Sequence, residues 1–165
     1  MLEPWTLLIA THAIAATSAI SIGLVQVVRT KRGDLVHRVI GRSWAGLMYI
    51  VSITGLLIGG YEGALNMFLK ALSVWMIISL SAGIYYACKG NIATHRGFMF
   101  GAYSGLIGAL IGVVAAPSRR IPSYFHAYPI PMTVIALSIT IVSVLLVWSV
   151  WRYGKRSVRA REDSW

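Results

Sequence analysis

Five long apolar runs, separated by short polar segments, dominate the pattern of the chain. The runs extend over residues of about 5–28, 35–60, 67–88, 95–116 and 130–151. A helix of about 20 residues, rising about 1.5 Å per residue, crosses the hydrocarbon core of a bilayer. The pattern therefore predicts an all-α integral membrane bundle with five transmembrane helices. Residues 1–165 then form a single transmembrane domain, in which residues 152–165 are a basic tail.

Small and polar residues recur on one helical face in two of these runs. In the first run they are His12, Ala16, Ala19, Gly23 and Gln26. In the fourth run they are Gly101, Gly105, Gly108 and Gly112. Small residues let helix backbones approach closely in lipid. We therefore expect the first stripe to face other helices, and the glycine-rich face to admit a second helix, a flat ligand or another subunit.

The composition agrees with a membrane protein and changes how the charge is interpreted. Hydrophobic residues make up 57% of the chain and charged residues only 12%, against about 25% charged in a typical soluble domain. The net charge of +10 would suggest nucleic acid in a soluble protein. Here the basic residues cluster at the ends of apolar runs, which predicts contact with the bilayer and its anionic lipid headgroups and no nucleic-acid partner.

The distribution of Lys and Arg predicts the orientation. Twelve of the 15 basic residues lie in the first and third connections, their flanks and the tail. The positive-inside rule then places the N-terminus outside and the C-terminus in the cytoplasm. The other three are Lys70, which is counted with the second connection, and the Arg119–Arg120 pair in the fourth connection, which is the exception to the rule. The first run is long enough to span and Glu3 stands where a signal peptide would be basic, so we expect it to be retained.

This topology sorts the four histidines into two layers. His37 and His95, each followed by arginine, begin spans on the cytoplasmic side, whereas His12 and His126 lie toward the outer side. A functional role is the default for an ionisable residue within a membrane. A b-type haem needs two imidazoles from facing helices, apolar walls and basic groups for its propionates. Two haems, one per layer, would carry electrons across the membrane. The candidate propionate partners are Arg38, Arg42 and Arg96.

Each of these residues also has a simpler explanation. A His-Arg pair at the interface is often a helix start that binds lipid phosphate, which would account for His37 and His95. His12 would then hydrogen-bond a neighbouring helix. His126 would be a surface residue of the loop at residues 117–131, whose aromatic content places it in the interface.

The sequence offers few candidate residues for other kinds of chemistry. No nucleotide-binding or hydrolase motif is present, and none of the five acidic residues lies within a span, which argues against proton coupling by a buried carboxylate. The single cysteine, Cys88, allows no internal disulfide. Three functions remain: a haem protein that takes electrons from quinol or a redox partner, a non-catalytic accessory or assembly subunit, and a small transporter. The absence of inverted repeats makes the transporter the weakest of these, and enzymatic activity stays open.

Two stretches carry a resemblance to a known family. The residues from His37 to Trp44 (HRVIGRSW) and from His95 to Met99 (HRGFM) resemble the two signatures of a bacterial family of predicted membrane proteins. This family is a domain of unknown function, number 2306. The resemblance, which with His12 covers most of the first four spans, implies a multi-pass protein of a bacterial cell membrane and no established activity. In the family an arginine often follows the second signature, where this chain has Phe100-Gly101. The histidine layout is also similar in kind to small two-haem transmembrane cytochromes b.

Overall fold

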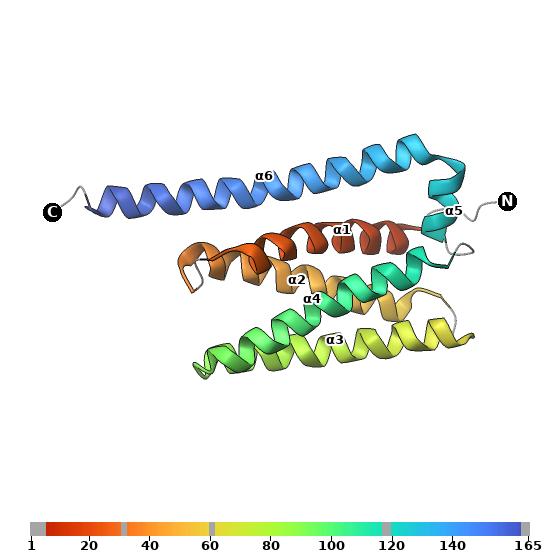
Figure 1. Ribbon diagram of the computed structural model, residues 1–165, viewed down its shortest axis with the longest axis horizontal. Coiled ribbons are helices and arrows are strands. Elements are labelled where there is room, and N and C mark those ends of the chain that lie inside the picture. The colour runs from red at the N-terminus through yellow and green to blue at the C-terminus, as the bar shows by residue number, and fades with distance from the viewer. Residues whose placement is uncertain (1–5, 31–32, 60–61, 117–119, 163–165) are drawn as a thin grey trace.

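The computed structural model describes residues 6–30, 33–59, 62–116 and 120–162, with side chains as far as residue 152 except at position 120. This part of the chain forms six α-helices and no strand (Figure 1). The helices are α1 (Leu7–Val28), α2 (Leu35–Leu57), α3 (Ala64–Cys88), α4 (Ile92–Val114), α5 (Arg120–Ala127) and α6 (Pro129–Glu162).

Five of the helices are long and apolar enough to cross a membrane: α1 to α4, and α6 over Pro129–Arg152. The predicted all-α membrane bundle with five spans is therefore confirmed. Several residues that entered the sequence predictions lie outside the described residues, namely residues 3, 5, 31, 32, 60, 119 and 163–165.

The fourth connection differs from the expected loop. It contains the short helix α5, and α6 already starts at Pro129 and continues through the basic tail to Glu162. Proline is well tolerated at the start of a helix because its fixed φ suits the first turn and its missing N–H has no intrahelical partner there. The prolines at 122 and 129 both fall in such first turns.

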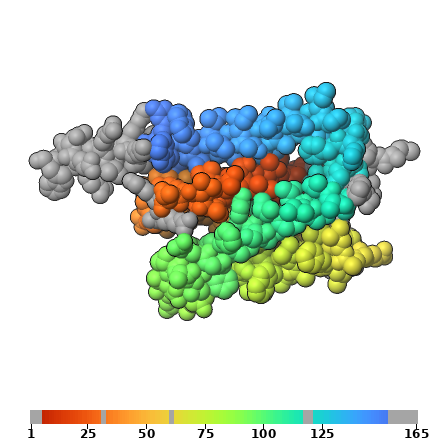
Figure 2. Space-filling model, in the orientation of Figure 1, coloured from red at the N-terminus to blue at the C-terminus, as the bar shows by residue number. Residues whose placement is uncertain are grey.

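The first four spans form a ring in which each helix packs against the next and α4 returns to α1. Helices α2 and α4 are therefore diagonally opposite, and their backbones do not contact each other. Helix α6 lies along α1 and α2 outside this ring, and α5 joins α4 to α6 (Figure 1). Part of α1 is visible between α4 and α6 in Figure 2. The core holds buried apolar side chains from all four ring helices, including Ile22, Met48, Leu80 and Leu106.

Side chains of α2 and α4 both bind carbonyl oxygens of α1. Trp44 Nε1 on α2 donates to the carbonyl of Ala19 at 3.0 Å, and the Tyr103 hydroxyl on α4 donates to that of Ile20 at 3.3 Å. A Cβ at Gly23 would lie 2.6 Å from the Tyr103 ring and 2.7 Å from Trp44 Nε1. Only glycine leaves room for both rings, and the predicted small stripe of α1 does face other helices.

The predicted glycine face of α4 is divided in the structure. A Cβ at Gly105 would lie 3.1 Å from Met76 Cε of α3. At Gly101, Gly108 and Gly112 a Cβ would meet nothing within 4 Å. One glycine therefore allows close packing on α3, while the other three leave a smooth surface.

Candidate functional site

Polar residues gather at both ends of the ring. We call the end with the α1–α2 and α3–α4 turns the His37 end, and the end with the α2–α3 turn and α5 the His12 end. The predicted site residues divide between them: His37, Arg38, Arg42, His95 and Arg96 at the His37 end, and His12 and His126 at the other.

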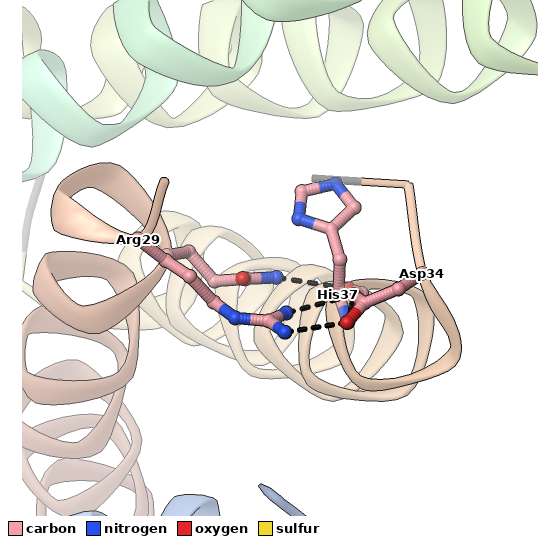
Figure 3. Close-up of polar contacts among 4 residues, drawn as sticks. Arg29, Asp34 and His37 are labelled. Carbon is pink, nitrogen blue, oxygen red and sulfur yellow. Dashed lines mark hydrogen bonds and ion pairs between the residues drawn. The ribbon is translucent and has the colours of Figure 1, made fainter. Parts of the chain in front are cut away.

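An ion pair ties the α1–α2 turn together at the His37 end. Arg29 donates from Nη1 and Nη2 to the two carboxylate oxygens of Asp34, at 2.9 and 2.5 Å. Asp34 is also the N-cap of α2, because its Oδ1 accepts the backbone N–H of His37 at 2.9 Å. Figure 3 shows these contacts around one carboxylate. The turn thus fixes the direction in which α2 leaves α1.

These contacts shift the acidity of Asp34. The hydrogen bonds from Arg29 hold the pKa of the carboxyl below its ordinary value, against the opposing effect of partial burial. The backbone N–H of His37 and the positive charge of Arg29 lower the pKa further. Asp34 therefore remains charged at pH values around the ordinary pKa of an aspartate, which keeps the Arg29–Asp34 ion pair, here called the clasp, intact.

Gln26 makes a second link between α1 and α2 one turn deeper. Its Nε2 donates to the carbonyl oxygen of His37 at 3.0 Å and lies 3.1 Å from the position of a Cβ on Gly41. Its Oε1 is buried and accepts no hydrogen bond within the described part of the chain. A buried acceptor without a donor costs about 1–3 kcal/mol, so this end holds a polar atom that its packing does not satisfy.

His37 lies on the face of α2 that turns toward the ring. It shares this face with Gly41, Trp44, Met48 and Ser52, which follow at helical spacing, and its Nδ1 is buried. In Figure 3 the imidazole of His37 is directed away from the Arg29–Asp34 pair. Arg38 and Arg42 are exposed and belong to the other side of the helix.

His95 is held by the neighbouring helix. Its Nδ1 lies 2.9 Å from the carbonyl oxygen of Gly83 on α3. Phe98 and Met99 fill the space over Gly83, where a Cβ would meet the Met99 methyl group. Arg96 is exposed. His37 and His95 thus occupy the same end of two diagonal helices, as predicted from their sequence context, and no contact between them is formed.

The His12 end is closed by contacts within the chain. His12 Nδ1 lies 2.9 Å from Thr54 Oγ1 on α2, and its Cε1 is 3.5 Å from the position of a Cβ on Gly55. Lys70 of α3 is buried and donates to the carbonyls of Leu56 and Ile58, at 2.5 and 3.4 Å. These carbonyls belong to the end of α2, where a cation interacts favourably with the helix dipole.

The sequence did not reveal the role of Lys70 at this end. The count of basic residues assigns Lys70 to the α2–α3 connection, whereas in the structure it binds the end of α2. The available signal was a lysine about one turn into an apolar run, where an ammonium group needs a partner.

His126 is not brought to His12. It is exposed on α5, which packs against α4 and α6, whereas His12 lies between α1 and α2. Nowhere in the described ranges do three or more His, Cys, Asp or Glu side chains gather in a way that could hold a metal ion.

A comparison with known families gives a match over most of the chain. The model of a family described as "Predicted membrane protein (DUF2306)" matches residues 9–151. The chain belongs to this family. No curated protein and no solved structure was found to match it. The match confirms the resemblance seen in the two His-Arg stretches, and it includes all four histidines and the apolar part of α6. Because the description of DUF2306 gives no activity, a functional proposal has to rest on the geometry.

Proposed function

We propose that this DUF2306 protein is a membrane electron-transfer protein that binds one b-type haem at the His37 end. His37 and His95 would hold the haem iron through their imidazole nitrogens. Electrons would come from a quinol or from a protein redox partner.

The observation that carries the proposal is how His95 is held. One nitrogen of its ring is fixed on the carbonyl of Gly83, and its Nε2 has no partner among the described residues. Metal-bound histidines are typically oriented in this way, with one ring nitrogen on a carbonyl or carboxylate and the other on the metal.

The position of His37 supports the same proposal. It lies on the ring-facing side of α2, at the same end as His95 on the diagonal helix α4. Cofactors in helical bundles are bound by side chains of facing helices. In Figure 1 α4 runs obliquely, so that its start lies apart from the α1–α2 turn. A haem bound there would not have to separate packed α2 and α4 backbones.

The residues around this position fit a flat group with one adjustment. Gly83 is small, and Arg96 is available at the membrane surface for a propionate. The Met99 side chain now covers Gly83 and would have to take another rotamer. Methionine is unbranched and adapts its shape readily, so this change is a modest one.

One haem is favoured over the two that the histidine count first suggested. A second haem would need His12 and His126, but His126 is exposed on α5, outside the ring of helices, and the His12 ring already contacts Thr54 between α1 and α2. The Thr54 contact gives His12 a sufficient role as a link between α1 and α2.

The visible spectrum of the protein purified in detergent tests the proposal. After expression with added haem precursor, we expect a Soret band and, on reduction with dithionite, the sharp α-band of a six-coordinate b-type haem. His37→Ala and His95→Ala should each lose these bands, whereas His126→Ala should keep them. A folded, colourless wild-type protein would contradict the proposal.

The second candidate is a non-catalytic accessory or assembly subunit. It is favoured by the bare surface of α4, where Gly97, Gly101 and Gly108 are exposed and a Cβ would meet nothing. A transmembrane helix of a larger complex can pack closely on such a surface. Purification in mild detergent should then retain a stoichiometric partner that Gly101→Leu releases. A monodisperse particle containing this chain alone would exclude this function.

We place the protein in a bacterial cell membrane with the His37 end in the cytoplasm, because the basic residues concentrate at that end. A C-terminal fluorescent fusion should then fluoresce, and a C-terminal alkaline phosphatase fusion should be inactive. The reverse result would invert the orientation.

A further inference from the structure

The lipid-facing side of α2 carries two arginines that have no partner among the residues that the structure describes. Arg38 and Arg42 are exposed, stand one turn apart, and make no hydrogen bond or ion pair with any described residue. Of the acidic side chains that the structure describes, Asp34 is engaged by Arg29 and Glu62 lies at the opposite end of the bundle.

The depth of Arg42 makes this arrangement unusual. It is the seventh residue after Leu35, which starts the span, so its Cα lies about 10 Å further along the helix. A guanidinium on a lipid-facing surface at this depth is costly unless it reaches a headgroup or an anion. Arg38 stands one turn nearer the surface on a neighbouring line of the helix, so that both guanidinium groups can reach one anion.

The surface below Arg42 is shaped for a hydrocarbon chain. One turn deeper lies Gly46, where a Cβ would meet nothing within 4 Å. Ile50, Ile53 and Leu57 continue the exposed face, with 42%, 50% and 66% of their surface accessible. The missing side chain at Gly46 lets an acyl chain lie against the backbone directly below the two cations.

We propose that this face of α2 is a binding site for an anionic phospholipid. Arg38 and Arg42 hold its phosphate, and one acyl chain runs along Gly46 toward Leu57. Arginine binds phosphate with two parallel hydrogen bonds, which gives geometric selectivity beyond general attraction to an anionic membrane. The site lies outside the ring, so it does not rest on the haem proposal.

Native mass spectrometry of the delipidated protein, titrated with phosphatidylglycerol or with phosphatidylcholine of the same acyl chains, tests the site. We expect one retained phosphatidylglycerol on the wild type, and adducts at least about ten-fold weaker with phosphatidylcholine. Arg42→Gln and Arg38→Gln should each weaken phosphatidylglycerol binding about ten-fold, as expected for loss of a charged hydrogen bond. Phosphatidylglycerol binding by Arg42→Lys should be intermediate, because lysine keeps the positive charge but cannot form two parallel hydrogen bonds to one phosphate.

Lys89→Gln is the charge-matched control. Lys89 is an exposed cation in the α3–α4 turn at the same end, and its loss changes the net charge equally. It should leave phosphatidylglycerol binding unchanged. Gly46→Leu, which fits without a clash, should weaken binding while every charge is kept.

Three results would overturn the proposal. The first is equal weakening of phosphatidylglycerol binding by Lys89→Gln and Arg42→Gln. The second is equal retention of the two lipids by the wild type. The third is a wild type that retains no phosphatidylglycerol but co-purifies with a protein that Arg42→Gln releases.

Discussion

At the His12 end, the polar side chains that lie between helices bind partners within the protein: His12 contacts Thr54, and Lys70 binds the last carbonyls of α2, while His126 is exposed on α5. At the His37 end, the Arg29–Asp34 clasp secures the turn, but Gln26 Oε1 stays unsatisfied and Arg38 and Arg42 point outward. Equal numbers of histidines therefore serve different purposes. The first end stabilises the bundle, and the second has groups left over for a ligand.

The largest stability effect is expected from Lys70. Lys70→Met removes the buried ammonium group that donates to two partly buried carbonyls at the end of α2, and a charged hydrogen bond contributes about 1.5–3 kcal/mol. The free energy of unfolding in detergent should fall by about 2–3 kcal/mol. Lys89→Met, at an exposed lysine of the His37 end, should change it by less than about 0.5 kcal/mol. Equal effects of the two substitutions would remove the distinction between the ends.

His12 should behave as a structural residue. His12→Ala removes the contact with Thr54 and leaves space between α1 and α2, so we expect a loss of about 1–3 kcal/mol in thermal or denaturant unfolding. His126→Ala, at an exposed histidine, should be nearly neutral. If His12→Ala were as harmless as this control, His12 would have to be reconsidered as a ligand.

The clasp at the His37 end should show itself through pH. The pKa of Asp34 is lowered in the folded protein, so its contribution is present above the ordinary Asp pKa. It is lost as the pH falls through the lowered value. Because the carboxylate is partly exposed, the loss of stability below the ordinary Asp pKa of about 4 should not exceed about 1 kcal/mol. Asp34→Asn keeps the N-cap and should flatten this part of the stability profile. An unchanged acid profile in the variant would mean that other carboxylates cause it.

The glycines of α4 should give the smallest effects. Gly101→Ala adds a methyl group that meets nothing and gains about 0.5–1 kcal/mol of helix stability. Gly105→Ala brings a Cβ to 3.1 Å from Met76 Cε, which should offset that gain. Melting temperatures in detergent should therefore rank Gly101→Ala above Gly105→Ala, and the opposite order would contradict the packing of α4 on α3.

Periodicity alone was enough to predict the five spans and the contact face of α1, because both follow from local spacing. The partners of that face were not predictable. Trp44 reaches the carbonyl of Ala19 across 25 residues, and Tyr103 reaches that of Ile20 across 83. The role of Lys70 was hidden for the same reason, since its acceptors belong to another helix.

The histidine layers were predicted in part. His37 and His95 do share one end of the ring, because each follows a short turn that returns the chain to the same side. His12 and His126 share the other end but not a neighbourhood. That separation depends on the short helix α5, which the pattern of hydrophobic residues did not predict.

We propose that the His37 end, and not the His12 end, binds a cofactor. Low-temperature electron paramagnetic resonance of the oxidised, haem-supplemented protein tests it most directly, because the signal reports the axial ligands. We expect the low-spin ferric signal of two imidazoles in the wild type and in His12→Ala, and its loss in His37→Ala. Loss of the signal in His12→Ala with retention in His37→Ala, or no haem signal at all in the folded wild type, would contradict the account.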